Sequence, residues 1–287
     1  MIITHINGGL GNQMFQYAAG RALALRHGTD LLLDTRAFDG STQFGYGLDH
    51  FAIVARKAGD GDLPPERKRA PLRYLLWRGL KLKPRLVRED GLSFNAGFDA
   101  LGDGVYLKGY WQSERYFKRF QAELRADFRI VTPPSDQNAA ILAELAERPA
   151  ISLHIRRGDY VRDARTNATH GTCTLDYYAR AAERIATTMS DAPLIVTFSD
   201  DPAWVRDNLR LPFEMRVMDH NDSDHNYEDL RLMSACRHHI IANSSFSWWG
   251  AWLNPSPDKV VVAPSRWFAD DKLVNRDIWP EGWIRLD

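Results

Sequence analysis

Residues 150–160 read AISLHIRRGDY, and this stretch decides how the rest of the chain is interpreted. A short apolar run between a proline and a glycine is typical of a buried strand. Its carboxyl end carries His154, Arg156, Arg157 and Asp159, and open α/β sheets bind their ligands at that edge. Two adjacent guanidinium groups are costly to bury without an anion, and they pair bidentately with phosphate or carboxylate. The pattern favours an anion site over the simpler alternative, a surface arginine pair held by Asp159.

The chain that follows alternates between strand and helix patterns. Further strands are expected at residues 194–198, 213–218, 237–242 and 260–263. Five strands within about 115 residues predict a parallel, doubly wound sheet. Asp200 and Asp201 follow one strand, and a serine-rich helix start follows another, so all should converge on the edge that holds the arginines. Pro202 suits a first helical turn, so either aspartate also fits a helix cap.

The chain opens with another strand, glycine loop and helix. Residues 1–12, MIITHINGGLGN, predict a strand and a loop, and apolar spacing predicts a helix over 13–26. Such a loop lets an anion approach backbone N–H groups, and Asn12 and Gln13 add amides suited to hydroxyls or a phosphate. The simpler alternative is a tight turn with Asn12 as the helix cap. A dinucleotide-binding loop is the rival, but Met14 stands where that motif has its third glycine.

Length and composition restrict the class of protein. The 287 residues suffice for one large or two ordinary domains, and the expected division is 1–148 and 149–287. Lysine and arginine total 37 against 37 acidic residues, so no global field suggests a nucleic-acid partner. Cys173 and Cys236 form neither a disulfide framework nor a metal-ligand spacing. Without a signal peptide or a membrane-length apolar run, the chain is expected to be cytoplasmic.

Residues 67–88 are strongly basic, with nine lysines and arginines interleaved with leucines and a tryptophan. The favoured interpretation is a surface helix whose long side chains lie along apolar neighbours. The alternative is peripheral contact with anionic lipid at a membrane surface. Residues 106–113, YLKGYWQS, predict a strand ending in an aromatic and polar rim, which suits either a sugar ring or a packed core edge.

Four motifs together resemble glycosyltransferase family 11, the α1,2-fucosyltransferases. They are GGLGNQMFQYA (8–18), HIRRGDY (154–160), FSDD (198–201) and NSSFSWWGAW (243–252). The resemblance runs from residue 4 to about 267. It implies an α/β fold of GT-B type, with two Rossmann-like domains whose parallel sheets face each other across a cleft. It also implies inverting transfer of L-fucose from GDP-β-L-fucose to a galactoside hydroxyl of an oligosaccharide or surface glycan, with no metal or cofactor.

The resemblance assigns roles to individual residues. Arg156 and Arg157 resemble the pair that grips the donor diphosphate, and His154 and Asp229 resemble groups near guanine and ribose. Other expected donor contacts at the strand ends, at a helix start and in the first loop are Asp200, Asp201, Ser244, Ser245, Phe246, Ser247, Gly9, Asn12 and Gln13. The expected catalytic residues are Arg156 and Asp159. Asp159 is the carboxylate nearest the arginines, although a carboxylate they hold would be a poor base.

The resemblance also bears on partners and location. The chain lacks the membrane anchor of the animal members, so it resembles a bacterial cytoplasmic form. Its partners would be GDP-fucose and a galactose-terminated glycan, and residues 67–88 could meet the inner face of the membrane.

Two other classes of protein stay open, as do the exact acceptor and the oligomeric state. One is a metal-dependent glycosyltransferase with another sugar-nucleotide donor, in which Asp222 and Asp224 hold Mg²⁺ or Mn²⁺ beside His220 and His225. The other is a non-catalytic glycan-binding protein that uses its many tryptophans and tyrosines.

Overall fold

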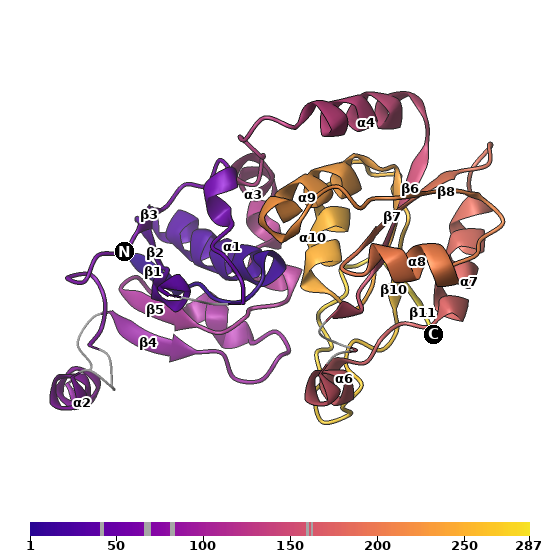
Figure 1. The fold of residues 1–287 in the computed structure, drawn as a ribbon. Helices are drawn as coiled ribbons and strands as arrows, with labels where there is room; N and C mark the ends of the chain where they lie inside the picture. Colours follow the sequence, from indigo (N-terminus) through magenta and orange to yellow (C-terminus); the bar gives the residue numbers. More distant parts are fainter. Residues whose placement is uncertain (41–42, 66–69, 81–83, 159–160, 162) are drawn as a thin grey trace. The chain divides into compact units, whose positions relative to one another are not determined.

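The computed structural model describes residues 1–40, 43–65, 70–80, 84–158, 161 and 163–287. These residues form two compact units, and each contains one parallel sheet (Figure 1). The first unit is Met1–Val131 with Asn275–Ile278, and the second is Thr132–Val274 with Trp279–Asp287. The predicted class, α/β with two parallel sheets, is therefore confirmed. That the two sheets face each other across a cleft stays a prediction.

The first unit has a five-stranded sheet in the order β3-β2-β1-β5-β4, and all neighbouring strands are parallel. Its strands are β1 (Ile2–His5), β2 (Leu31–Asp34), β3 (Arg56–Lys57), β4 (Arg85–Arg88) and β5 (Val105–Lys108). Its helices are α1 (Leu10–His27), α2 (Pro71–Gly79) and α3 (Gln121–Asp127), with 3-10 turns η1 (Arg36–Phe38), η2 (Leu48–His50), η3 (Ala96–Ala100), η4 (Glu114–Tyr116) and η5 (Lys118–Phe120).

The helix α1 lies directly against β1 and β2, and one glycine makes this approach close enough. A Cβ built on Gly20 would stand 2.0 Å from Oγ1 of Thr4 and 2.9 Å from Cδ1 of Leu31. Both distances are shorter than real Cβ contacts. The side chain of Thr4 is fully buried, so it has little space into which to move.

The second unit has a six-stranded sheet in the order β11-β10-β9-β6-β7-β8, again parallel. Its strands are β6 (Ala150–Ile155), β7 (Leu194–Ser199), β8 (Glu214–Val217), β9 (His238–Ile240), β10 (Val261–Pro264) and β11 (Ile284–Leu286). Its helices are α4 (Asp136–Glu147), α6 (Ala164–His170), α7 (Leu175–Ala186), α8 (Pro202–Asn208), α9 (Asn226–Ala235) and α10 (Ser245–Leu253), with the turn η6 (Ser223–His225). The helix α4 lies in this unit and packs on α9, whereas the predicted division at 148/149 assigned it to the first domain; that division stays a prediction.

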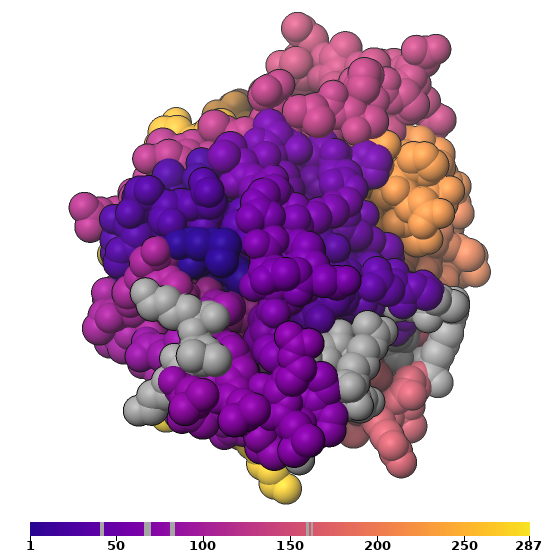
Figure 2. All heavy atoms as spheres, turned by 90° about the vertical axis from the view of Figure 1, so that its left-hand side faces the viewer, coloured from indigo at the N-terminus to yellow at the C-terminus, as the bar shows by residue number. Residues whose placement is uncertain are grey.

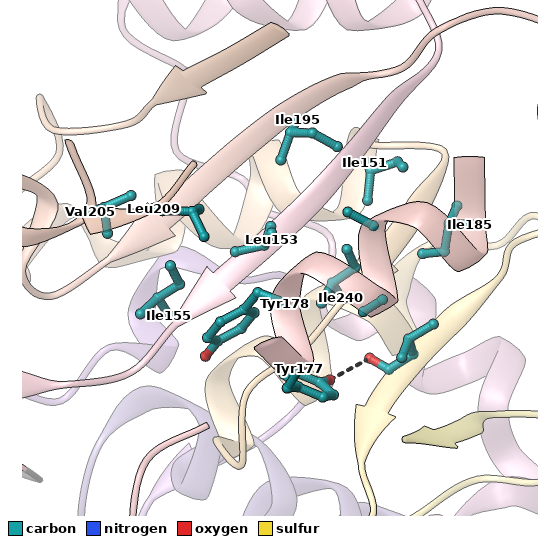
Figure 3. Packing of buried hydrophobic residues seen from close by; sticks show 13 residues of the cluster. Ile151, Leu153, Ile155, Tyr177, Tyr178, Ile185, Ile195, Val205, Leu209 and Ile240 are labelled. Carbon is teal, nitrogen blue, oxygen red and sulfur yellow. Dashed lines mark hydrogen bonds between the residues drawn. The ribbon is translucent and has the colours of Figure 1, made fainter. Parts of the chain in front are cut away.

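Helices cover both faces of the second sheet, as the doubly wound pattern predicts. Ile151, Leu153 and Ile155 of the fully buried strand β6 pack with residues of α7 and α8 on one face (Figure 3). Because side chains alternate along a strand, Ala150 points to the other face, where it lies in the core formed with α4 and α9. In the core that contains Ile151, Leu153 and Ile155, the hydroxyl of Tyr177 donates to the carbonyl oxygens of Ile241 at 2.7 Å and Val262 at 3.2 Å. The side chains of β6 are therefore fixed before the strand reaches its polar end.

The structure corrects three sequence expectations. The basic stretch 67–88 is not one surface helix, because α2 ends at Gly79 and 85–88 form β4, paired with β5. The helix α1 begins at Leu10, its N-cap is Gly9, and no side chain caps it, so Asn12 as the cap is wrong. The strand expected over 106–113 ends at Lys108. The short strands β3 and β11 were not predicted.

No helix in the ranges that the structure describes is long and apolar enough to cross a membrane.

We expect Gly20→Ala to destabilise the protein by about 1–3 kcal/mol, because the added methyl group overpacks the contact with Thr4 and Leu31. Thr4→Ala in the same chain should restore part of the loss, since it removes the nearest atom. Urea unfolding measures both, with Gly102→Ala as the control because no atom lies within 4 Å of a Cβ there. Equal stability of the Gly20→Ala and Gly102→Ala variants would contradict the packing argument.

Candidate functional site

One carboxylate organises the residues that follow β6. Asp200 follows β7, the parallel neighbour of β6. Its Oδ2 lies 2.9 Å from Nη1 of Arg156, and its Oδ1 accepts a hydrogen bond from the backbone N–H of Arg157 at 2.9 Å. Asp200 therefore orients one arginine through its side chain and the next through its backbone. The expected convergence of these residues at one sheet edge is present, and the aspartate that holds Arg156 here is Asp200.

Gly158 allows this carboxylate to come so close. A Cβ on Gly158 would stand 2.3 Å from Oδ2 of Asp200 and 2.9 Å from its Cγ. Any side chain at position 158 would have to displace the carboxylate that holds Arg156. The glycine after the arginine pair is thus part of the site's geometry.

Arg157 is held by an aromatic ring and by a second aspartate. Its guanidinium carbon lies 3.6 Å from the ring centroid of Trp204 in α8, a close cation–π contact. Its Nε lies 3.9 Å from Oδ2 of Asp201, and it is buried without a hydrogen-bond partner among the described residues. Asp201 also accepts from the N–H of Trp204 at 3.2 Å and so caps α8. The cap alternative therefore holds for Asp201, while Asp200 serves the arginines.

His154 is buried beside these charges. Burial lowers its pKa to about 4; the charge of Asp200 opposes this shift and that of Arg156 adds to it. The imidazole is therefore neutral at pH 7. Its Nδ1 is buried, and nothing in the described part of the chain hydrogen-bonds to it. A buried polar atom without a described partner, beside the Arg156 cation, marks a position that a ligand can complete.

The ring of His154 leads to the start of α10. Its centroid lies 5.9 Å from that of Phe246. Ser244 is the N-cap, and its side chain accepts from the N–H of Phe246 at 3.3 Å, while Ser247 donates to the carbonyl oxygen of Ser244. Ser245 and Phe246 are half-buried, and Ser244 and Ser247 are buried. The positive end of this helix dipole and the two guanidinium groups follow neighbouring strands of one sheet, which makes this edge suited to an anion.

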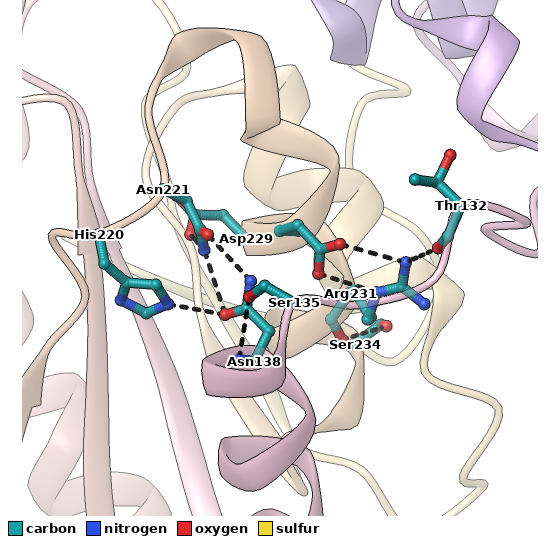
Figure 4. Close-up of polar contacts among 9 residues, drawn as sticks. Thr132, Ser135, Asn138, His220, Asn221, Asp229, Arg231 and Ser234 are labelled. Atoms are coloured by element: carbon teal, nitrogen blue, oxygen red, sulfur yellow. Dashed lines mark hydrogen bonds and ion pairs between the residues drawn. The ribbon is translucent and has the colours of Figure 1, made fainter.

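Asp229 lies in the first turn of α9 within a polar network (Figure 4). Its Oδ1 accepts from Nδ2 of Asn221 at 2.8 Å, and Asn221 in turn accepts from Nδ2 of Asn138 at 2.9 Å. The Oδ1 of Asn138 lies 2.7 Å from Nε2 of His220. Burial raises the pKa of Asp229 to about 6, which the hydrogen bond from Asn221 opposes. The network joins α4 to α9 and fixes the orientation of a carboxylate that is costly to ionise.

Asn138 and Asn221 were not singled out from the sequence. Asn138 is fully buried within a helix whose apolar positions set its pattern, and Asn221 lies 83 positions further along the chain. A buried asparagine on the core side of an amphipathic helix is the one signal that could have drawn attention to Asn138.

In the first unit, the predicted amides face the protein. Gln13 is fully buried, and its Nε2 donates to the carbonyl oxygens of Gly8 at 2.9 Å and Gly45 at 2.8 Å. Its Oε1 accepts from the N–H of Gly47 at 3.0 Å. Gln13 therefore ties the glycine loop to the segment around residue 45, and its side chain is not presented to a ligand. Asn12 accepts from Nε2 of Gln112 at 2.8 Å.

A charged cluster at the carboxyl ends of β1 and β2 was not predicted. Asp34 accepts from Nε and Nη2 of Arg36, each at 2.8 Å, and from the hydroxyl of Tyr106 at 2.7 Å. The Nδ1 of His5 lies 3.6 Å from Oδ2 of Asp34. Burial raises the pKa of Asp34, but these donors outweigh it and hold the pKa well below its usual range. Asp34 is thus buried and engaged, which also removes the acidic residue that a dinucleotide loop would need for its ribose.

Two further sequence candidates have different outcomes. Asp159 lies outside the described residues, so its role as a general base stays a prediction. Asp222 accepts from the N–H groups of Asp224 and His225 and caps a 3-10 turn. In the portion of the chain that the structure describes, no three His, Cys, Asp or Glu side chains are grouped as a metal ion would require.

The family model for glycosyl transferase family 11 matches residues 98–287. The chain belongs to this family. An Alpha-1,2-colitosyltransferase of Escherichia coli is 32% identical over 299 residues, which cover 100% of this chain and 99% of the relative. Galactoside alpha-(1,2)-fucosyltransferase 1 of Plecturocebus brunneus is 26% identical over 86% of this chain and 63% of its own length.

Among solved structures, a mutant of Arabidopsis thaliana FUT1 in complex with GDP is similar, with a TM-score of 0.51 and 12% identity, over 100% of this chain and 76% of that one. This likeness is one of fold, which is GT-B-type as the sequence predicted. Because it belongs to this family, the chain is a glycosyl transferase. The two alternatives considered from the sequence, a dinucleotide-binding dehydrogenase and a non-catalytic glycan-binding protein, are therefore set aside.

We expect Asp229→Asn to stabilise the protein at pH 7.5 by roughly 2–3 kcal/mol, the cost of ionising a carboxyl whose pKa is raised to about 6. The raised pKa means that the folded state binds a proton more tightly than the unfolded chain. The contribution of Asp229 to the free energy of unfolding of the wild type is therefore fully present below about pH 4, and it is lost as the pH rises through 6. Urea unfolding across this range should show a gap between variant and wild type that closes near pH 4.

Asp207→Asn makes the same chemical change at an exposed position of the same unit and supplies the matched control. A gap for Asp229→Asn that is independent of pH, or a loss of stability at pH 7.5, would contradict the assigned ionisation.

Proposed function

We propose that this glycosyl transferase moves L-fucose from GDP-β-L-fucose to a galactoside hydroxyl of an oligosaccharide or surface glycan, with inversion to an α1,2 linkage. The observation that carries the proposal is the arginine pair at the end of β6, ordered by Asp200 beside the start of α10, in a chain of family 11. The relative named as a galactoside alpha-(1,2)-fucosyltransferase supports the choice of sugar and linkage.

The arginines would act on the leaving group. Negative charge develops on the diphosphate as the bond between sugar and phosphate breaks, and fixed cations that need no reorganisation lower the barrier. Arg156 is about a quarter exposed, so it can meet a ligand while Asp200 holds it in place. The dipole of α10 adds positive potential, with Ser244, Ser245, Phe246 and Ser247 at its start. Because Asp200 and Asp201 balance the two guanidinium charges in the free protein, the diphosphate would share or replace these partners.

His154 and Asp229 would recognise the nucleoside. A carboxylate is the natural acceptor for the N1–H and 2-amino groups of guanine, and the neutral His154 has a buried nitrogen that awaits a partner. Hydrogen bonds from the bound guanine would stabilise the ionised carboxylate of Asp229 and so offset the free-energy cost of its ionisation in the folded protein. Gly9 and Asn12 stay proposed donor contacts, and Gln13 would act by holding the loop that carries them.

A general base is also required, since inversion in one step must remove the proton of the acceptor hydroxyl. Asp159 stays the proposed candidate on the basis of sequence alone.

Colitose is the alternative sugar, and one observation favours it. The E. coli relative named as a colitosyltransferase matches over nearly its whole length at 32% identity. Colitose is L-fucose without its 3-hydroxyl group. A site that hydrogen-bonds this hydroxyl rejects the deoxy sugar strongly, whereas a site built for colitose rejects fucose only by crowding. The ratio of kcat/KM for the two GDP-sugars therefore separates these functions.

We expect fucosyl product from GDP-fucose and lactose, an accessible galactoside, and we expect its rate to be unchanged by EDTA. Arg156→Ala should lower kcat/KM by roughly 10²–10³-fold, because it removes a cation that stabilises the leaving diphosphate. Product formation is measured by chromatography, and NMR of the product gives the linkage. GDP-colitose is run in parallel.

Arg184→Ala removes an exposed arginine of the same unit and should leave the rate unchanged. Activity that EDTA abolishes would favour the metal-dependent alternative. Full activity of the Arg156→Ala variant would show that the arginine pair is not the diphosphate site.

A further inference from the structure

The helix α2 of the first unit turns a leucine face to solvent. Leu72, Leu75, Leu76 and Leu80 are 76%, 62%, 61% and 66% exposed. At 100° per residue, Leu72, Leu75 and Leu76 span an apolar stripe roughly 100° wide, and Leu80 follows directly as the C-cap residue of α2. A surface helix of a globular protein normally buries such a stripe against its core. The leucines of α2 are instead exposed. The helix itself lies on the side of the molecule that faces the viewer in Figure 2.

The other side of α2 is the one that contacts the protein. Trp77 is only 6% exposed, and it lines a pocket together with Leu63, Pro64 and Pro84. The ring of Tyr74 lies 5.8 Å from that of Trp77, on the same side of the helix. The leucine face is therefore not the surface through which α2 is attached to its own unit.

Cations border the leucine face on both edges. On the helical wheel Arg73 lies beyond Leu76 and Arg78 lies beyond Leu75, and both arginines are exposed. The exposed Arg85 and Arg88 follow in β4. The whole stretch 67–88 contains nine lysines and arginines and neither Asp nor Glu. An apolar face between cations, without an acid in 22 residues, has the charge and shape of a surface that meets an anionic, apolar partner.

We propose that α2 docks on an anionic phospholipid bilayer, with its four leucines among the acyl chains near the headgroups and Arg73 and Arg78 at the phosphates. The arginines extend from the edges of the face, so their charged ends can reach the headgroups while the leucines go deeper. A second copy of the chain is a less suitable partner for the leucine face of α2. Pairing of this face with itself would bring two uncompensated basic patches together.

Membrane docking goes beyond the proposed function and does not depend on it. It would concentrate the enzyme at a membrane surface. Vesicle binding needs no donor or acceptor, so the two proposals can fail separately.

The test is flotation of the whole protein with vesicles of phosphatidylcholine alone or with about 30% phosphatidylglycerol. We expect at least tenfold more protein bound to the anionic vesicles, and a marked loss in about 0.5 M NaCl, where charges are screened. Leu72→Ser/Leu76→Ser and Arg73→Ser/Arg78→Ser should each lower the partition coefficient about tenfold or more. Circular dichroism checks that both variants are folded.

Matched controls make the same chemical changes elsewhere. Val54→Ser/Val131→Ser removes two apolar side chains that are about half exposed, and Arg129→Ser/Arg184→Ser removes the same charge. Both controls should float like wild type. Equal binding to neutral and anionic vesicles, or unchanged binding of the leucine variant, would overturn the proposal. So would sedimentation showing that the leucine substitutions convert a dimer to a monomer.

Discussion

The arrangement of the arginine pair depends on the Asp200 carboxylate, which contacts both the side chain of Arg156 and the backbone N–H of Arg157. This contact follows from the parallel pairing of β6 with β7, which sets Ile155 opposite Ser199. A shift of one residue in this pairing would turn the polar ends to opposite faces. The absent side chain of Gly158 then allows the carboxylate to approach. Secondary structure, register and a single glycine together order two adjacent cations before any ligand arrives.

The buried polar residues singled out in the two units differ in how far the protein itself satisfies them. In the first unit, Gln13 and Asp34 are satisfied by the protein itself and act as structural ties. In the second unit, His154 keeps a buried nitrogen without a described partner, and burial raises the pKa of Asp229. Such groups cost stability, which the buried core around β6 must offset. His154 and Asp229 both lie in the unit that holds the arginine pair, and a ligand bound there could complete them.

Much of this arrangement was predictable because it follows from local pattern. The strand β6 is an apolar run with clear ends, and parallel strands end at one edge, so the convergence of the arginine pair with Asp200 and Asp201 at that edge could be expected. The ion-pair or hydrogen-bond partner of each individual side chain could not be predicted. Asp159 and Asp200 are equally plausible from sequence, and the link from Asn138 through Asn221 to Asp229 joins residues far apart in the chain.

The remaining errors also have physical causes. Alternating leucines and cations in 67–88 fit both a helix and a strand, and only pairing with β5 decides that 85–88 extend the sheet. The strand β11 has three residues, too few for a periodic signal. The hydrogen bonds of Gln13 to Gly8 and Gly45 could not be foreseen from the sequence, because they exist only once the loop has folded.

We propose that the arginine pair after β6 binds the diphosphate of a guanosine nucleotide. Isothermal titration with GDP and GMP on wild type and on Arg157→Ala tests it most directly, because the two ligands differ only in the second phosphate. Our account predicts that wild type binds GDP at least about tenfold more tightly than GMP, and that this ratio falls towards one in the variant. An unchanged ratio in the variant, with GDP still bound tightly, would show that the second phosphate lies elsewhere.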